Sequence, residues 1–440
     1  MVRNIRARLS HWIGDDALKR LIKNSSLLFS AEILVTLIGV VQFPLVSRWL
    51  GAADYGLWGI VTGWVRIVGL ILSFRLWETV TRYFSKYLTG NDESRALAIL
   101  KLCLLIDFTI AALTFAVVSL SAEWASALFV KRPDGVDLIR LEALHLLTLV
   151  TMSVWMAVLR VFDRFKFISV YNVMSAIALF AITVVMLRWG GGVAGMIVAA
   201  TVVNLCQTLW LAARAGRELK SKFNRRWFTA DLRTLRDDWR EIWVMLFSMN
   251  IDTFRKIAVN NADIVILGWL STPAQAGVYQ LAKRLASYFG RFTDPIYDSL
   301  FPEVSRLYAA DGPVRVKPLI QKLTRGILIG LGVSVTAAYV FSDWVIPFIF
   351  GPDYVPAIPV FYVMILTNIW AVCLWAPSVL IAAGKSKQLT AINTATSLIM
   401  LALLLLFTGW WGAVGASTAL VCFHVMWVSA MIWATRSVLA

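Results

Sequence analysis

The chain has 440 residues, of which 59% are hydrophobic and only 15% are charged. An average soluble domain carries about 25% charged residues, so this composition excludes an ordinary soluble enzyme, a disordered tail and a coiled coil. Lys and Arg outnumber Asp and Glu by 42 to 26, which gives a net charge of +16. In a soluble protein that excess would indicate nucleic-acid binding, whereas in a membrane protein its meaning depends on where the charges lie.

Long apolar stretches follow one another along the chain. A transmembrane helix needs about 20 mostly apolar residues, and about twelve such stretches occur, separated by glycine, proline and polar breakers. The expected spans are 25–49, 55–81, 97–121, 138–161, 165–187, 191–213, 241–270, 276–303, 323–346, 355–381, 388–409 and 412–434. The sequence therefore predicts an all-α polytopic membrane protein.

Residues 1–24, before the first span, are polar and basic. They are too polar for a cleavable signal peptide, and the span that follows is too long and lacks a small-residue cleavage site. Leu9, Trp12, Ile13 and Leu21 alternate with Arg and Lys, which fits a short amphipathic helix on the cytoplasmic membrane surface. A solvated basic tail is the alternative interpretation of this segment.

The basic residues between the spans predict the orientation. Most of them fall in loops on one side, above all in the linker 214–240. Those on the opposite side are Arg48, Lys131, Arg132 and Arg188. The positive-inside rule places the basic side, and with it both termini, in the cytoplasm. The positive charge is then mainly topological, and we expect no nucleic-acid partner.

The linker 214–240 also divides the expected spans into two equal sets. We expect an N-terminal lobe at 25–213 and a C-terminal lobe at 241–440. A weak internal repeat agrees with this division, because Tyr55-Gly56 and Ala276-Gly277 lie at corresponding positions, separated by about 220 residues. A parallel repeat is typical of a transporter with two lobes, here of about six helices each, around a central cavity.

Several basic residues fall inside the expected spans. They are Arg66, Arg75, Arg140, Arg255, Lys256, Lys283, Arg284 and Arg291. A charge at the bilayer centre is unfavourable by roughly 2.5–3.5 kcal/mol, so it persists where it faces protein, water or a counter-ion. Arg66 has no acid within a turn, which predicts that it faces a water-filled cavity or an anionic ligand. Arg75 lies one turn from Glu78 and is interpreted as part of a local ion pair.

Two neighbouring spans each carry a charged stripe at helical spacing. The first stripe contains Asp252, Lys256, Asn260 and Asp263, with Arg255 beside it. The second contains Gln280, Arg284, Ser287, Arg291, Asp294 and Asp298. The stripes fit the wall of a polar cavity in the C-terminal lobe. An internal salt-bridge network that locks two helices together is the alternative, because the acids are numerous enough to neutralise the bases.

Acids within apolar spans are candidates for carrying protons. The coupling candidates are Glu32, Asp252, Asp263 and Asp294. For Glu32, an ion pair with a basic residue on another helix is equally open. Asp107 is interpreted as paired with such a residue.

The sequence lacks the common signatures of catalysis and metal binding. Its 4 cysteines lie singly in apolar stretches, which predicts neither a disulfide nor a zinc site. No GxxxxGK[ST] motif is present, so we expect no ATP hydrolysis by that route. The longest expected outer loop, 122–137, offers one Glu, two Asp and no His. We therefore expect no catalytic residues and no metal site, and we do not expect an enzyme.

A series of short motifs carries a resemblance to a known family. The motifs lie at 48–58, 81–85, 263–279, 300–308, 349–354, 384–387 and 412–416. In their order and spacing they resemble a Wzx-type oligosaccharide-lipid flippase of the multidrug/oligosaccharidyl-lipid/polysaccharide (MOP) exporter superfamily. The resemblance extends over nearly the whole chain.

This resemblance implies a flippase of the cytoplasmic (inner) membrane that moves undecaprenyl-diphosphate-linked oligosaccharide repeat units by alternating access, for O-antigen or exopolysaccharide synthesis. It implies no cofactor beyond coupling to a proton or sodium gradient. Its expected partners are the lipid-linked glycan, membrane lipids, and a polysaccharide polymerase with its co-polymerase.

The expected substrate-binding residues are Arg66, Arg255, Lys256, Arg284 and Arg291. Arginine suits a diphosphate because its planar guanidinium donates paired hydrogen bonds and stays charged. A cation-coupled multidrug or metabolite antiporter of the same superfamily is the first alternative, and it would favour acids over bases in its cavity. A membrane polysaccharide polymerase is the second alternative.

Overall fold

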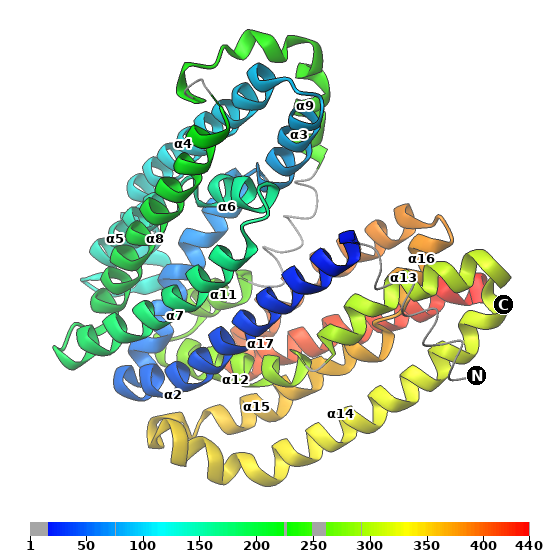
Figure 1. The fold of residues 1–440 in the computed structure, drawn as a ribbon. Coiled ribbons are helices and arrows are strands. Elements are labelled where there is room, and N and C mark those ends of the chain that lie inside the picture. Colours follow the sequence, from blue (N-terminus) through cyan, green and yellow to red (C-terminus); the bar gives the residue numbers. More distant parts are fainter. Residues whose placement is uncertain (1–15, 75, 224–226, 249–260, 292, 440) are drawn as a thin grey trace. The chain divides into compact units, whose positions relative to one another are not determined.

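The computed structural model describes residues 16–74, 76–223, 227–248, 261–291 and 293–439 (Figure 1). Within these ranges the secondary structure consists of helices and their connections, without a strand. The helices are α2 (Asp16–Leu72), α3 (Leu76–Thr89), α4 (Glu93–Ala125), η1 (Ser126–Val130), α5 (Gly135–Thr148), α6 (Met152–Val161), α7 (Phe165–Arg188), α8 (Gly192–Lys222), η2 (Trp227–Thr229), η3 (Leu232–Asp238), α9 (Trp239–Ser248), α11 (Ala262–Leu270), α12 (Pro273–Arg291), α13 (Asp294–Asp311), α14 (Pro313–Phe350), η4 (Pro352–Tyr354), α15 (Ala357–Ile365), η5 (Leu366–Cys373), α16 (Ala376–Ala382) and α17 (Ser386–Leu439).

Eight helical stretches in the described part of the chain are long and apolar enough to cross a membrane. Two of them, Ser25–Thr89 and Ser386–Val438, span 65 and 53 residues. Since one crossing takes about 20 residues, each is long enough for two crossings. A glycine with positive φ interrupts the helix in each stretch, at Gly51 (φ 72°) and at Gly412 (φ 57°). The chain is therefore a polytopic all-α membrane protein, as the sequence predicts.

The boundaries of several expected spans differ in the structure. The expected span 276–303 is divided, because α12 ends at Arg291 and α13 begins at Asp294, with Pro295 in its first turn. Proline lacks the backbone N–H that would continue a helix, so the break falls in front of it. The expected span 241–270 passes through residues 249–260, which lie outside the described ranges.

A second break separates α5 from α6, within the expected span 138–161. Thr151 adopts a left-handed conformation (φ 68°), and its backbone N–H donates a 3.0 Å hydrogen bond to the Asp107 carboxylate. Among the described residues the partners of Asp107 are Thr151 and Ser153, and not a basic residue as its interpretation expected. Its carboxylate instead accepts from the start of α6, where helical N–H groups lack partners within the helix.

The chain divides into two compact units. The described residues of the first unit lie within Met1–Val46, Leu72–Leu120 and Arg140–Ile251, and those of the second lie within Ser47–Ile71, Ser121–Ile139 and Asp252–Ala440. In the first unit, α3 packs against α6 and α9, and α8 packs against α6 and α7. Phe84 of α3 is fully buried in this core, 5.7 Å from the ring of Phe162.

The second unit is built mainly from the C-terminal helices. Its α12, α15 and α17 lie side by side, and α14 packs along α13 and α15 (Figure 1). The segment Ser47–Ile71 of α2 also belongs to this unit, although it lies in the first half of the sequence. The compact units therefore do not follow the midpoint of the chain.

Glycines bring the segment Ser47–Ile71 into backbone contact with α12. A Cβ atom on Gly56 would lie 1.8 Å from the carbonyl oxygen of Pro273, and one on Gly277 would lie 1.8 Å from that of Ala52. Only glycine permits so close an approach. The contact is reciprocal, since Gly56 and Gly277 occupy corresponding positions of the internal repeat. Reciprocal contacts arise where two equivalent elements meet at a two-fold axis.

Candidate functional site

The structure describes only some of the residues expected at the site. Asp252, Arg255 and Lys256 lie outside the described ranges. Arg291 ends α12 and Asp294 begins α13, and the description does not extend to their side chains. The four remaining expected residues are Glu32, Arg66, Asp263 and Arg284.

Glu32 and Arg66 both lie on α2, in different units. Glu32 belongs to the first unit and its side chain is exposed. Arg66 belongs to the second unit and is also exposed, between the buried Val65 and Val68. Arg66 forms no ion pair with any residue in the described ranges.

Asp263 lies at the centre of a buried ionic cluster. It is the second residue of α11 and is fully buried. One carboxylate oxygen, Oδ2, accepts hydrogen bonds from the hydroxyl of Tyr279 and the ammonium of Lys283, and Oδ1 accepts a 2.9 Å bond from the N–H of Ile264. Both carboxylate oxygens are therefore satisfied, which a buried carboxylate requires. We call Asp263, Tyr279 and Lys283 the Asp263 cluster.

Helix geometry explains how the two donors reach one carboxylate. Tyr279 and Lys283 are four residues apart on α12, so their side chains lie on the same face, one turn apart. The acid lies in the first turn of α11, where the helix dipole favours a negative charge. On α17, His424 is close enough to Lys283 for the two groups to interact electrostatically, and its Nδ1–H donates to the Leu420 carbonyl at 2.8 Å.

Arg284 follows Lys283 on α12 and has different neighbours. Its guanidinium lies against the hydroxyl groups of Tyr55 on α2 and Tyr288 on α12. Tyr55 is fully buried. Tyrosine hydroxyls are neutral hydrogen-bonding groups, so these two neighbours bring no opposite charge to the guanidinium. Arg284 is thus a half-buried cation with two tyrosine hydroxyls beside it.

Gln280 lies one turn before Arg284 on the same face of α12. Its side-chain oxygen is buried and has no hydrogen-bond partner among the described residues. The side chain packs against Gly59, where a Cβ would approach that oxygen to 2.0 Å. Buried polar atoms without partners are uncommon in native proteins, and they occur where a ligand or water completes the site. Arg284 and Gln280 thus place a half-buried cation and a buried amide oxygen on one helix face.

The sequence located part of this arrangement. It placed Gln280 and Arg284 on one stripe and Asp263 on a neighbouring one. It did not assign Lys283 to the site, because Lys283 lies one step off the stripe. It also missed Tyr55, Tyr279 and Tyr288; the spacing of four residues between Tyr279 and Lys283 was the available local signal.

Comparison with known proteins agrees with these features. A family model described as "Polysaccharide biosynthesis protein" matches residues 21–308, which is more than half of the chain. The chain belongs to the polysaccharide biosynthesis protein family. It is 26% identical over 360 residues to the inner membrane protein YghQ of Escherichia coli (strain K12), a match that covers 79% of this chain and 98% of that protein.

Solved structures establish the fold of this family member. A multidrug resistance MATE family transporter of the MOP superfamily, in an inward-facing conformation, superposes with a TM-score of 0.72 at 11% identity, over 92% of this chain and 94% of that one. The lipid II flippase MurJ, in an inward closed conformation, gives a TM-score of 0.69 at 12% identity, over 94% and 87%. At such low identities the likeness shows the fold alone, which is that of MOP-superfamily transporters. The predicted polysaccharide family is confirmed by the family model, and the predicted fold by the solved structures.

Proposed function

We propose that this protein is a flippase that moves an undecaprenyl-diphosphate-linked oligosaccharide across the cytoplasmic (inner) membrane, for O-antigen or exopolysaccharide synthesis. The polysaccharide biosynthesis family, the MOP fold and the inner-membrane relative support this choice over catalysis. The observation that carries the proposal is Arg284, a half-buried guanidinium beside the hydroxyls of Tyr55 and Tyr288.

The chemistry of a diphosphate matches this position. A diphosphate carries fixed negative charge that must pass a low-dielectric slab, and a guanidinium donates paired hydrogen bonds to phosphate oxygens. Charge-assisted hydrogen bonds contribute about 1.5–3 kcal/mol each. Arg66, accessible in the same unit, is the second cation of the proposed route. Arg255, Lys256 and Arg291 complete the proposed binding set.

Alternating access requires a contact between the two halves of the sequence that opens and closes. The Gly56–Gly277 contact is such an element, because it joins backbone segments without interlocking side chains. Two loop residues that we place on the outer side strengthen it: Arg132 pairs with Asp54 at 2.7 Å, and Lys131 donates to the Trp269 carbonyl. We propose that this outer contact is closed while substrate enters from the cytoplasm, where we also place both termini.

Coupling to a proton or sodium gradient completes the proposal. Of the coupling candidates Glu32, Asp252, Asp263 and Asp294, the one with described buried partners is Asp263. Protonation of Asp263 on α11 removes the negative charge that neutralises Lys283, and a cation bound beside the carboxylate competes with the ammonium for it. Either event would release a charged Lys283, which then stands without its carboxylate one residue from Arg284 on α12.

Transport in reconstituted vesicles tests this function. Wild-type protein should move a fluorescent undecaprenyl-diphosphate glycan between leaflets, as measured by the loss of fluorescence to an impermeant quencher. The matched control is the same glycan on neutral undecaprenol, which should not move faster than in empty vesicles. Movement of cationic drugs without movement of the diphosphate lipid would instead identify a multidrug antiporter.

A further inference from the structure

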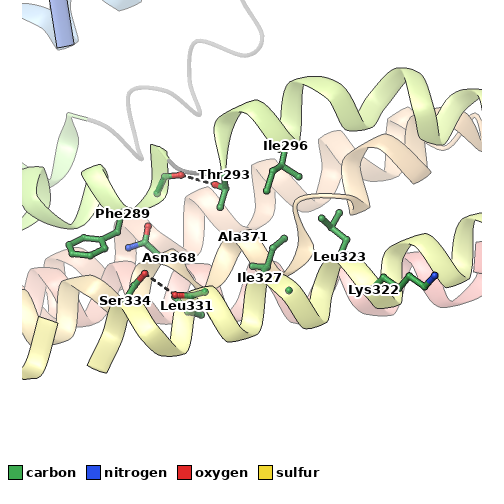
Figure 2. Close-up of a pocket in the computed structure, with 13 residues that line it drawn as sticks. Phe289, Thr293, Ile296, Lys322, Leu323, Ile327, Leu331, Ser334, Asn368 and Ala371 are labelled. Atoms are coloured by element: carbon green, nitrogen blue, oxygen red, sulfur yellow. Dashed lines mark hydrogen bonds between the residues drawn. The ribbon is translucent and has the colours of Figure 1, made fainter. Parts of the chain in front are cut away.

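An elongated groove lies within the second unit, away from the Asp263 cluster. It has a volume of about 450 Å³ and is lined by α12, α13, α14 and η5. Figure 2 shows Phe289 and Lys322 at opposite ends, with Ile296, Leu323 and Ile327 between them. The α14 wall runs from Lys322 to Ser334, a length of about 18 Å at 1.5 Å per residue.

Two glycines on α14 leave the groove open. Gly326 and Gly330 are one turn apart and line the same wall. A Cβ atom on either one would meet nothing within 4 Å. Small residues in membrane helices usually allow two helices to pack closely. Here the missing side chains instead leave an open channel.

The polar residues of the groove present few free donors to it. Ser334 donates to the carbonyl of Gly330 at 2.8 Å, and Thr293 donates to that of Gly290 at 2.7 Å (Figure 2). The amide nitrogen of Asn368 donates to the carbonyls of Ala286 and Ile365. Because backbone carbonyls occupy these donors, the lining is suited to hydrocarbon.

One end of the groove is positively charged. Lys322 is the single charged residue of the lining, and its side chain is exposed. It lies on the N-terminal part of α14, close in sequence to Lys317 and Arg325. The positive-inside rule places this basic segment at the cytoplasmic face. The groove thus combines a hydrocarbon channel with a cation at the leaflet from which substrate would load.

We propose that this groove binds the isoprenoid chain of the lipid-linked substrate, with Lys322 beside its phosphate; this inference rests on the proposed function. A cavity of about 150 Å³ accommodates benzene, so 450 Å³ accommodates about 18 carbon atoms. That volume takes one chain segment. A phospholipid has two acyl chains on one head group, whereas an undecaprenyl lipid has a single chain. The groove has room for one chain and has one charged residue, Lys322, at its end, so it fits the undecaprenyl lipid better.

Filling the groove tests the inference. Gly330→Phe and Gly326→Leu place a side chain in open space, so neither should disturb folding. The matched control is Gly332→Phe, because Gly332 is exposed on the same helix, has no atom within 4 Å of its Cβ position and does not line the groove. Native mass spectrometry of the detergent-solubilised protein with undecaprenyl phosphate should show affinity reduced at least tenfold by the two filling variants and unchanged by the control.

Charge at Lys322 gives the second arm of the test. Lys322→Glu should weaken the binding of undecaprenyl phosphate at least fivefold and leave the binding of neutral undecaprenol unchanged. Wild-type affinity for undecaprenyl phosphate in Gly330→Phe would overturn the inference. If the filling variants lose phosphatidylglycerol binding as strongly as they lose undecaprenyl phosphate binding, the groove is not specific for an isoprenoid chain and that assignment is overturned.

The same measurements separate this inference from the proposed function. If wild-type protein fails to move the diphosphate glycan while the filling variants still bind undecaprenyl phosphate more weakly than wild type, the flippase proposal fails and the groove assignment stands. If wild-type protein moves the glycan and the filling variants bind and transport like wild type, the groove assignment alone fails.

Discussion

Each unit holds an aspartate that binds a tyrosine and a lysine of one helix, in opposite environments. In the first unit, Asp238 accepts 2.7 Å and 3.1 Å bonds from Tyr87 and Lys86 of α3. In the second, Asp263 accepts from Tyr279 and Lys283 of α12. The Asp238 side chain is 15% exposed and its lysine 51% exposed, whereas Asp263 is fully buried.

The environment decides what each cluster contributes. Around Asp238, exposed pairs join the linker to the helices of the first unit, and Arg95 adds bonds to Asp237 and Asp238. Solvent screens such pairs, so each stabilises by about 0–1 kcal/mol. Around Asp263 there is little screening, and loss of one partner leaves a buried charge. The same residue types therefore form a screened surface cluster in one unit and a buried cluster in the other, where loss of one partner is far more costly.

The largest effect is expected from breaking the buried cluster. Asp263→Ala leaves Lys283 without its carboxylate, and removal of one partner of a buried pair destabilises by about 3–5 kcal/mol. Thermal unfolding of the purified protein in detergent measures this loss. The double variant Asp263→Leu with Lys283→Met removes both charges and should recover most of the stability. A double variant as unstable as Asp263→Ala would show that the pairing is not the reason.

A moderate effect is expected at the glycine contact in the second unit. Gly277→Val inserts a branched side chain against the carbonyl of Ala52, and overpacking of this kind is unfavourable by about 1–3 kcal/mol. The closed contact should open more often. In a cysteine-free background, Ala52→Cys should then react with an impermeant thiol reagent at least about fivefold faster.

The control for this effect is Gly332→Val, which adds the same side chain where no atom lies within 4 Å. It should leave the reactivity of Ala52→Cys unchanged. Equal reactivity in Gly277→Val and in the parent protein would show that the contact does not limit access to Ala52.

The smallest effect is expected at Asp238. The hydrogen bond from Tyr87, followed by that from Lys86, lowers the pKa of Asp238 below its ordinary value. Its contribution to stability is therefore fully present above the unfolded-state pKa of about 3.9 and is lost as the pH falls through the lower folded-state pKa. Asp238→Asn should lower stability by about 1 kcal/mol at pH 7. Melting temperatures between pH 7 and pH 3 should converge for wild type and variant; a constant difference would contradict the assignment.

The sequence predicted the helices well and their partners poorly, for physical reasons. Apolar length alone identifies spans, and turn-by-turn spacing placed Gln280 and Arg284 on one face. The partner of Asp263 depends on how α11 and α12 are rotated about their axes, which spacing within one helix does not determine. The pairing of Asp263 with Tyr279 and Lys283, which lie on the neighbouring helix, is such a case.

Contacts between distant segments were the least predictable. Nothing local indicates that Tyr55 meets Arg284, because the approach depends on glycines at Gly56 and Gly277 that permit backbone contact. The internal repeat had already paired these two glycines by position. Residues at corresponding positions of two repeats touch each other when the repeats meet at a two-fold axis. The sequence shows which positions correspond, but only the structure shows that they meet.

We propose that Arg284, the half-buried arginine of the second unit, receives a diphosphate. The sharpest test is the initial rate of undecaprenyl-diphosphate glycan movement in vesicles that contain Arg284→Ala, Arg284→Lys or Arg82→Ala protein. Arg82 pairs with Glu241 at 3.0 Å on the exposed surface of the first unit and is the matched control. We expect at least a tenfold loss of rate for Arg284→Ala, partial retention for Arg284→Lys, and a rate within twofold of wild type for Arg82→Ala. Equal rates for Arg284→Ala and Arg82→Ala would contradict the proposal.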